Sequence, residues 1–152
     1  MTNFKNLPQY NLILIRYNEI WLKSTKVKMR MLKILMQNIR NMLEKAEISY
    51  HKYQLSKDST RIFFFFKNED LPAAVEVLKK VFGIYTLSPA LRTSNRMKNI
   101  TERAVEIAHQ VLKEGDSFAI RSKRSGTHDF TSQDVARKAG QAVLEGLNHL
   151  NL

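Results

Sequence analysis

The sequence predicts an α+β protein made of two small domains. Up to residue 92, apolar residues follow the spacing of strands and helices in the order β, α, β, β, α, β, and a polar hinge at 92–95 precedes a shorter α, β, α segment. The 152 residues and 43% hydrophobic content are enough for a buried core in one domain or in two small ones. We therefore expect domains at 1–92 and 93–152.

The first domain opens with an apolar run over 11–17, which is typical of a central strand. Ser24 and Thr25 are both suitable N-caps for the helix that follows, whose mostly basic residues share one face. The opposite, apolar stripe of this helix is expected at Val27, Met31, Leu35, Ile39 and Met42.

Two strands are expected next, over 48–55 and 60–66, because both segments are rich in β-branched and aromatic residues and a Ser-Lys-Asp-Ser turn separates them. The second segment contains four consecutive phenylalanines, Phe63 to Phe66. They are only superficially similar to an RNA-stacking platform, since no RNP consensus surrounds them, and core packing is the favoured interpretation.

A second helix is expected to begin at Pro72 and to carry an apolar stripe as far as Phe82, with Gly83 as its C-terminal stop. Residues 84–91 then supply a fourth strand. This order of elements predicts the split βαβ, or ferredoxin-like, arrangement. Right-handed crossovers place both of its helices on one face of the sheet.

The second domain looks incomplete. Helical stripes run over 100–111, which Gly115 ends, and over 135–147, and the alternation of 117–122 between them predicts a single strand. One strand cannot pair both of its backbone edges within such a unit. Further strands must therefore come from elsewhere, and a second copy of the chain or a separate subunit would supply them.

The charge balance favours a polyanionic partner. Lys and Arg number 25 against 14 Asp and Glu, which gives a formal net charge of +11 and a pI near 10.0. Nucleic acid and an anionic membrane both fit this charge. No apolar run approaches the roughly 20 residues of a bilayer span, and the N-terminus lacks the apolar stretch of a signal peptide, so we expect a cytoplasmic protein without a membrane partner.

The sequence contains no cysteine. Disulfides, a thiolate nucleophile, a persulfide carrier and Cys-type zinc sites are therefore excluded. His51 and His109 have no partners at metal-ligand spacing, so no metal site is indicated. A catalytic triad of Ser125, His128 and Asp129 is disfavoured, because residues this close on one loop rarely reach the required geometry.

The most informative stretch is FAIRSKRSGTHDFTSQDVARK at 118–138, where an expected strand delivers cations into a loop that ends at a helix N-terminus. A glycine permits close approach of the backbone, and the free N–H groups of a first helical turn favour an anion. His128 and Phe130 add surfaces for base stacking. The candidates for phosphate binding are Arg121, Lys123, Arg124, Gly126, and Thr131 or Ser132 as the helix cap.

Each of these features also has a simpler interpretation. Thr131 and Asp134 would form an ordinary capping box, with the cations as a solvated rim. Arg16 and Lys23, which flank the turn after the first strand, could touch a phosphate or could simply solvate the end of that strand.

Three segments resemble a known family: RYNEIWLKS at 16–24, VFGIYTLSPA at 81–90 and FAIRSKRSGTHDFTSQDVARKAGQAV at 118–143. The family is that of the tRNA 4-thiouridine synthetases, also called tRNA sulfurtransferases or thiamine-biosynthesis protein I. Its members carry a ferredoxin-like domain followed by a THUMP domain, and the motifs lie in that order over nearly the whole chain. Asn18 stands where the family usually has Gly, which a turn with positive φ tolerates.

By this resemblance, the THUMP loop and the adjoining helix start engage the acceptor stem and 3′ CCA end of tRNA. The RNA contacts that the resemblance implies are Arg121, Lys123, Arg124, His128, Thr131, Ser132 and Arg137. Gly126 and Lys138 of the same stretch, together with Arg16 and Lys23, complete the candidate set.

The family's ATP-pyrophosphatase domain, with its Ser-Gly-Gly-x-Asp-Ser loop, and the strands that close the THUMP sheet are not found in this sequence. The resemblance thus implies a truncated THUMP domain, with no catalytic residue and no cofactor in this chain. ATP and Mg²⁺ are expected to serve a missing or separate catalytic subunit. Two other functions stay open: an RNA-binding module for a methylase, pseudouridine synthase or deaminase, and a regulatory domain for a small ligand.

Overall fold

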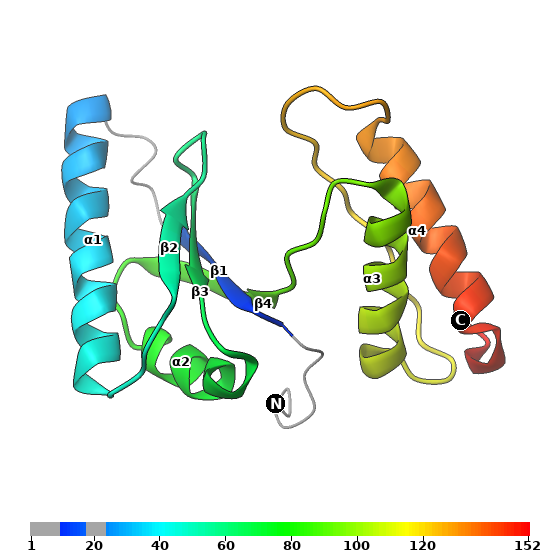
Figure 1. Cartoon of the computed structure of the whole chain (residues 1–152), viewed down its shortest axis with the longest axis horizontal. Helices are drawn as coiled ribbons and strands as arrows, with labels where there is room; N and C mark the ends of the chain where they lie inside the picture. The colour runs from blue at the N-terminus through cyan, green and yellow to red at the C-terminus, as the bar shows by residue number, and fades with distance from the viewer. Residues whose placement is uncertain (1–9, 18–23) are drawn as a thin grey trace. The chain divides into compact units, whose positions relative to one another are not determined.

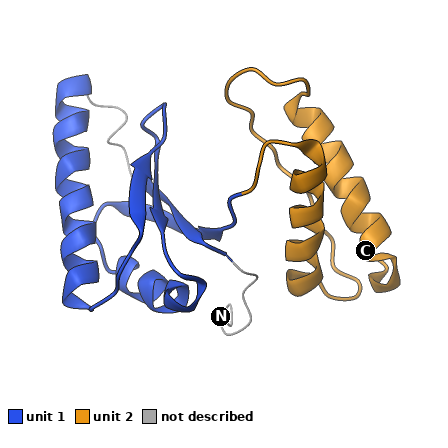
Figure 2. Ribbon diagram, viewed as in Figure 1, with its two compact units in different colours: residues 1–5, 9–92 blue, residues 6–8, 93–152 orange. Residues whose placement is uncertain are grey.

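The computed structural model of the chain describes residues 10–17 and 24–152. They fall into two compact units, residues 10–92 and residues 93–152, which are described one at a time (Figure 2). The turn at Asn18 and the candidate Lys23 lie outside the described residues. No helix in the described part is both long and apolar enough to cross a membrane.

Unit 1 is a four-stranded antiparallel sheet with two helices on one face (Figure 1). The strand order is β2-β3-β1-β4, which confirms the split βαβ arrangement. In chain order the elements are β1 (Leu12–Tyr17), α1 (Thr25–Lys45), β2 (Lys52–Leu55), β3 (Arg61–Phe65), a 3-10 turn η3 (Asn68–Asp70), α2 (Leu71–Leu78) and β4 (Ile84–Ala90).

The predicted hairpin joins β2 to β3, although β2 is shorter than expected. Its turn is held by Ser56, whose Oγ accepts hydrogen bonds from the backbone N–H of Thr60 at 3.2 Å and of Arg61 at 3.1 Å and donates to Asp58. Such side-chain bonds fix the turn and with it the register of the hairpin.

The core of unit 1 lies between the sheet and the helices. The residues that α1 buries are Leu32, Leu35, Ile39 and Leu43, whereas Val27 is 43% and Met31 37% exposed. The expected stripe was therefore wrong at its N-terminal end. Residues spaced by four drift around a helix by about 40° per step, so Val27 lies about 120° from Ile39.

Helix α2 also ends earlier than expected. It buries Leu71, Ala74, Val75 and Leu78, but the chain then tightens into turns, and Phe82 is 96% exposed rather than part of a helical stripe. Gly83 has φ +96°, a conformation that glycine adopts without strain. It turns the chain into β4 instead of capping the helix.

Unit 2 contains two packed helices, α3 (Met97–Val111) and α4 (Ser132–Gly146), and a short 3-10 turn η4 (Asn148–Leu150). Gly146 is where they approach closely, because a Cβ there would lie 2.9 Å from Cγ1 of Val105. The buried residues of unit 2 are Ala139, Val143 and Leu147, and α3 buries none.

The segment 117–122 does not form the predicted strand. Within the described residues, no backbone N–H from 117 to 130 donates to another backbone carbonyl, because unit 2 offers no strand edge to pair with. The predicted alternation nevertheless holds: Phe118 and Ile120 are half-buried, and Ala119 is exposed. Ile120 packs on α4, where a Cβ at Gly140 would be 3.8 Å from its Cγ1.

Candidate nucleic-acid interface

The segment 121–131 leads into α4 and carries most of the candidate residues. Arg121 and Lys123 are exposed, and Ser122 between them is half-buried. Both cations are therefore open to solvent, where a phosphate can reach them.

The loop that follows is braced by its own side chains. Nη1 of Arg124 donates to the carbonyl oxygen of Phe130 at 3.0 Å. Nε2 of His128 lies 3.0 Å from the carbonyl oxygen of Ser125, and the rings of His128 and Phe130 stack at 5.5 Å with 8° between their planes. Gly126 has φ +85°, which suits glycine. The sequence did not anticipate this bracing role of Arg124.

Thr131 caps α4 through a complete capping box, as the simpler interpretation predicted. The N–H of Asp134 donates to Oγ1 of Thr131 at 3.1 Å, and the N–H of Thr131 donates to the Asp134 carboxylate at 2.9 Å. The hydrogen bond from the Thr131 N–H, and after it the Thr131 hydroxyl, hold the pKa of the Asp134 carboxyl below its ordinary value. This carboxylate already occupies part of the positive helix end. The backbone N–H groups that remain available to bind an anion there are those of Ser132 and Gln133.

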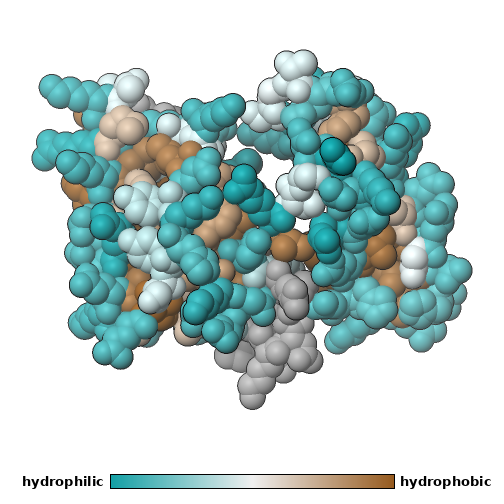
Figure 3. Space-filling view, viewed as in Figure 1, coloured by the Kyte–Doolittle hydropathy of each residue, from teal (hydrophilic) through white to brown (hydrophobic). Residues whose placement is uncertain are grey.

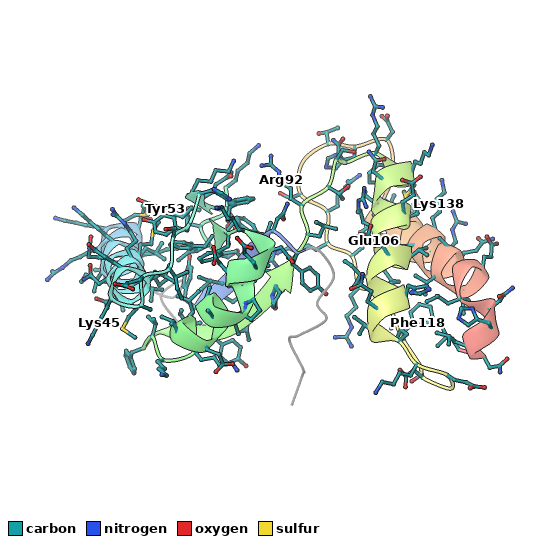
Figure 4. All side chains as sticks on the ribbon, turned by 60° about the horizontal axis from the view of Figure 1, so that its bottom comes forward. Lys45, Tyr53, Arg92, Glu106, Phe118 and Lys138 are labelled. Atoms are coloured by element: carbon teal, nitrogen blue, oxygen red, sulfur yellow. The ribbon has the colours of Figure 1, made fainter. Side chains whose placement is uncertain are left out.

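Two further cations follow on α4. Nη2 of Arg137 lies 3.3 Å from Oδ1 of Asp134, and the Arg137 side chain is 72% exposed. An ion pair this exposed contributes little, so Arg137 can exchange Asp134 for a phosphate at small cost. Lys138 is exposed beside it on the same helix (Figure 4).

A cleft of 420 Å³ lies between the tip of this loop and the start of α3. Thr127 to Phe130 line one side of it, and Asn95, Arg96 and Met97 line the other. The sequence alone does not single out Arg96, because it directly follows a polar stretch that is typical of a hinge. A cation directly before a helix was the signal that could have identified it.

The remaining candidates are not part of this loop. Arg16 lies in β1 of unit 1, exposed, opposite Arg61 and Thr86. His128 contacts the backbone oxygen of Ser125 rather than its hydroxyl, which is not a nucleophile–base pair. In the part of the chain that the structure describes, no group of three His, Cys, Asp or Glu is placed to hold a metal ion.

Two protein families match the chain, one for each unit. The ThiI ferredoxin-like domain matches residues 12–88, and the THUMP domain matches residues 94–152.

Curated relatives and a solved structure agree with these matches. A probable tRNA sulfurtransferase of Methanosarcina acetivorans is 40% identical over 106 residues, which are 70% of this chain and 24% of that protein. One from Saccharolobus solfataricus is 45% identical over 75 residues, 49% of this chain and 20% of that protein. The crystal structure of PH1313 from Pyrococcus horikoshii Ot3 superposes with a TM-score of 0.73 at 28% identity, covering 89% of this chain and 44% of that one.

The chain therefore spans about a quarter or less of the length of these curated relatives, in their non-catalytic N-terminal part. With both units matched in this order, the chain belongs to the ThiI family, as a ferredoxin-like domain followed by an RNA-binding THUMP domain.

Proposed function

We propose that this chain is the tRNA-binding part of the machinery that makes 4-thiouridine in tRNA, and that it grips the acceptor stem and the 3′ CCA end. The observation that carries the proposal is the loop of unit 2, where exposed Arg121 and Lys123 lead through a braced turn to the N-terminus of α4. The sulfurtransferase names of its relatives suggest the reaction that this binding serves.

The two ends of the loop have different tasks in this proposal. Arg121 and Lys123 neutralise phosphates of the stem, which releases condensed counterions. The terminal nucleotide meets the N–H groups at the start of α4, and its base stacks on the paired rings of His128 and Phe130. Arg137 then turns from Asp134 to a phosphate.

The role of the chain in catalysis is positioning. Adenylation of the uridine and transfer of sulfur belong, in this proposal, to an ATP-pyrophosphatase domain or subunit that uses ATP and Mg²⁺. A homodimer or such a subunit would pair with unit 2, and the reaction would take place in the cytoplasm. Holding the acceptor end fixes the distance from that end to the modified uridine, which lets one site select one nucleotide.

The test compares RNA affinity between matched lysines. Lys123→Ala should weaken binding of an acceptor-stem minihelix by about 1 to 3 kcal/mol, roughly 5- to 150-fold, if the side chain makes a charge-assisted phosphate contact. Lys80→Ala removes an exposed cation just after α2 and should change little. Arg124→Ala is a less clean probe, because it also removes the brace to Phe130.

Removing the CCA nucleotides from the minihelix should weaken binding to the wild-type chain and leave the remaining affinity strongly salt-dependent. Binding would be measured by fluorescence anisotropy at several salt concentrations. Unchanged affinity without CCA, together with equal losses in the Lys123 and Lys80 variants, would mean diffuse electrostatic binding and would reject the clamp.

A further inference from the structure

The sheet of unit 1 has a second face on which no helix lies among the described residues (Figure 1). Ile13, Ile15, Ile62 and Phe64 belong to the core beneath α1 and α2, so the strand residues between them point to the other side. We name this side the open face. The pairing register arranges it in three rows: Lys52, Phe65, Leu12 and Ala90; Gln54, Phe63, Leu14 and Ser88; and Arg61, Arg16 and Thr86.

Two aromatic rings stand in the open face. Phe63 and Phe65 are half-buried, and neither belongs to the core cluster or packs against it. Phe65 has cations on its ring: Nζ of Lys52 lies 4.8 Å from the ring centroid and Cζ of Arg92 lies 5.9 Å from it. In such cation–π contacts the cations lie over the ring, so a base that stacks there displaces them toward its own phosphates.

Charge on the open face has one sign. Lys52, Arg61 and Arg16 are all part of its rows, Arg92 reaches Phe65 from the end of the sheet, and none of the strand positions on this face is acidic. A surface of rings framed only by cations complements a ligand that has both flat apolar faces and negative charge. Nucleic acid is such a ligand.

We propose that the open face binds unpaired nucleotides of an RNA, with one base stacked on Phe65, its neighbour on Phe63, and their phosphates on the surrounding cations. Positions two apart on a strand are separated by roughly 6.8 Å, about twice the 3.4 Å rise of a helical nucleic-acid strand. Successive bases must therefore unstack to use both rings. A duplex, whose bases are already stacked and paired, cannot do this.

The other side of the same sheet shows the contrast. Tyr53 lies on the side of α1 (Figure 4), where it stacks on Phe64 at 5.3 Å and has Cζ of Arg40 at 5.7 Å from its ring. Nε of Arg40 also donates to the hydroxyl of Tyr50. Those rings pack on one another, whereas Phe65 on the open face contacts two cations and, among the described residues, no second ring.

The inference rests on the proposed function in one respect, which is that the negatively charged ligand is RNA. It is tested with the full chain and two labelled RNAs, an unstructured octanucleotide and a blunt-ended duplex. Phe65→Leu keeps an apolar side chain but removes the ring, so it should weaken binding of the octanucleotide about tenfold. Phe65→Trp should retain the affinity, and duplex binding should be unchanged in both variants.

Phe82→Leu is the matched control, because it removes an even more exposed phenylalanine of the same unit that lies outside the sheet. Circular dichroism and a denaturation midpoint establish that each variant is folded. Equal effects of Phe65→Leu and Phe82→Leu on the octanucleotide overturn the proposal. Equal losses for octanucleotide and duplex overturn it too, since they indicate binding without stacking.

Two further outcomes distinguish RNA binding at the open face from a protein interface there and from the RNA clamp proposed in unit 2. If light scattering finds a dimer that Phe65→Leu dissociates while octanucleotide affinity is unchanged, the open face is a protein interface and the proposal is wrong. If Lys123→Ala leaves minihelix binding unchanged while Phe65→Leu still impairs the octanucleotide, the clamp in unit 2 fails and the open face stands.

Discussion

The two units bury their apolar residues to different extents. In unit 1, side chains from the sheet and from both of the helices that cover it reach full burial, among them Ile13, Ile39 and Leu71. In unit 2 only three residues of the α4 region do so, and hydrophobic side chains reach the surface along the α3–α4 pair (Figure 3). The difference follows from backbone pairing: the extended segments of unit 1 hydrogen-bond to one another, and the segment 117–130 has no such partner within the described residues.

Amide hydrogen exchange should show the largest contrast between the units. The amides of β1, which lies between two strands, should exchange only through global unfolding, and those of 118–122 should exchange near their free rates. For a stability of about 5 kcal/mol the rates would differ by more than roughly a thousandfold. Protection of 118–122 that appears only at high protein concentration would show that a second copy supplies the missing strand, and protection at every concentration would contradict the unpaired segment.

A cavity in the core of unit 1 should have the next largest effect. Phe64→Ala removes a fully buried ring and should lower the free energy of unfolding by about 3 to 5 kcal/mol. Phe63→Ala, one residue away on the open face, should cost less than half as much. Denaturant titrations of both variants test this, and equal losses would show that the open face is packed as tightly as the core.

The helix pair of unit 2 offers two glycines for a paired comparison. Gly146→Ala should destabilise unit 2 by about 1 to 3 kcal/mol, because the added Cβ meets Val105 at 2.9 Å. Gly140→Ala places its Cβ at an ordinary 3.8 Å from Ile120 and gains helix propensity, so it should stabilise by about 0.5 to 1 kcal/mol. Thermal melts that move in the same direction for both would refute this view of the helix contact.

Loss of the cap on α4 should have a smaller effect. Thr131→Ala removes the hydroxyl that accepts from the N–H of Asp134 and should cost about 1 kcal/mol. Thr101→Ala removes a hydroxyl that donates to the Lys98 carbonyl inside α3, and it should be close to neutral. The melting temperatures of the two variants test this difference. A Thr101 variant as unstable as the Thr131 variant would argue against a stabilising role of the cap.

Lowering the pH should produce the smallest change in stability among these tests. Because its hydrogen bonds lower the pKa of Asp134 in the folded chain, this carboxylate stabilises α4 fully above the ordinary Asp range and loses that effect as pH falls through the lowered pKa. The stability difference between wild type and Asp134→Asn should thus shrink as the pH falls below the ordinary pKa range of Asp. A difference that stays constant as the pH falls would exclude the carboxylate as its source.

The sequence predicted the strands of unit 1 and their order, because alternation and turn residues are local signals. It misplaced the stripe of α1, since several apolar sets compete on that helix and only the position of the sheet decides between them. It also treated four phenylalanines as one group, whereas Phe64 and Phe66 enter the core and Phe63 and Phe65 leave it. Strict application of the strand period would have separated them.

Prediction of the candidate site from sequence succeeded for charge and failed for geometry. The cations and the capping box at Thr131 follow from residue types and spacing. The contact of Arg124 with Phe130, and the approach of Arg96 to the loop tip, depend on how the chain folds back on itself. Composition and periodicity hold no information about such contacts.

The place of β1 in the middle of the sheet has a consequence for synthesis on the ribosome. This strand is made first, but one of its two neighbours, β4, ends only at Ala90. At 5–20 residues per second, Ile13 and Ile15 wait roughly 4 to 15 seconds before the sheet that buries them can close. Until β4 has been made, the nascent chain exposes an apolar strand with at least one unpaired edge, which is the kind of segment that chaperones bind.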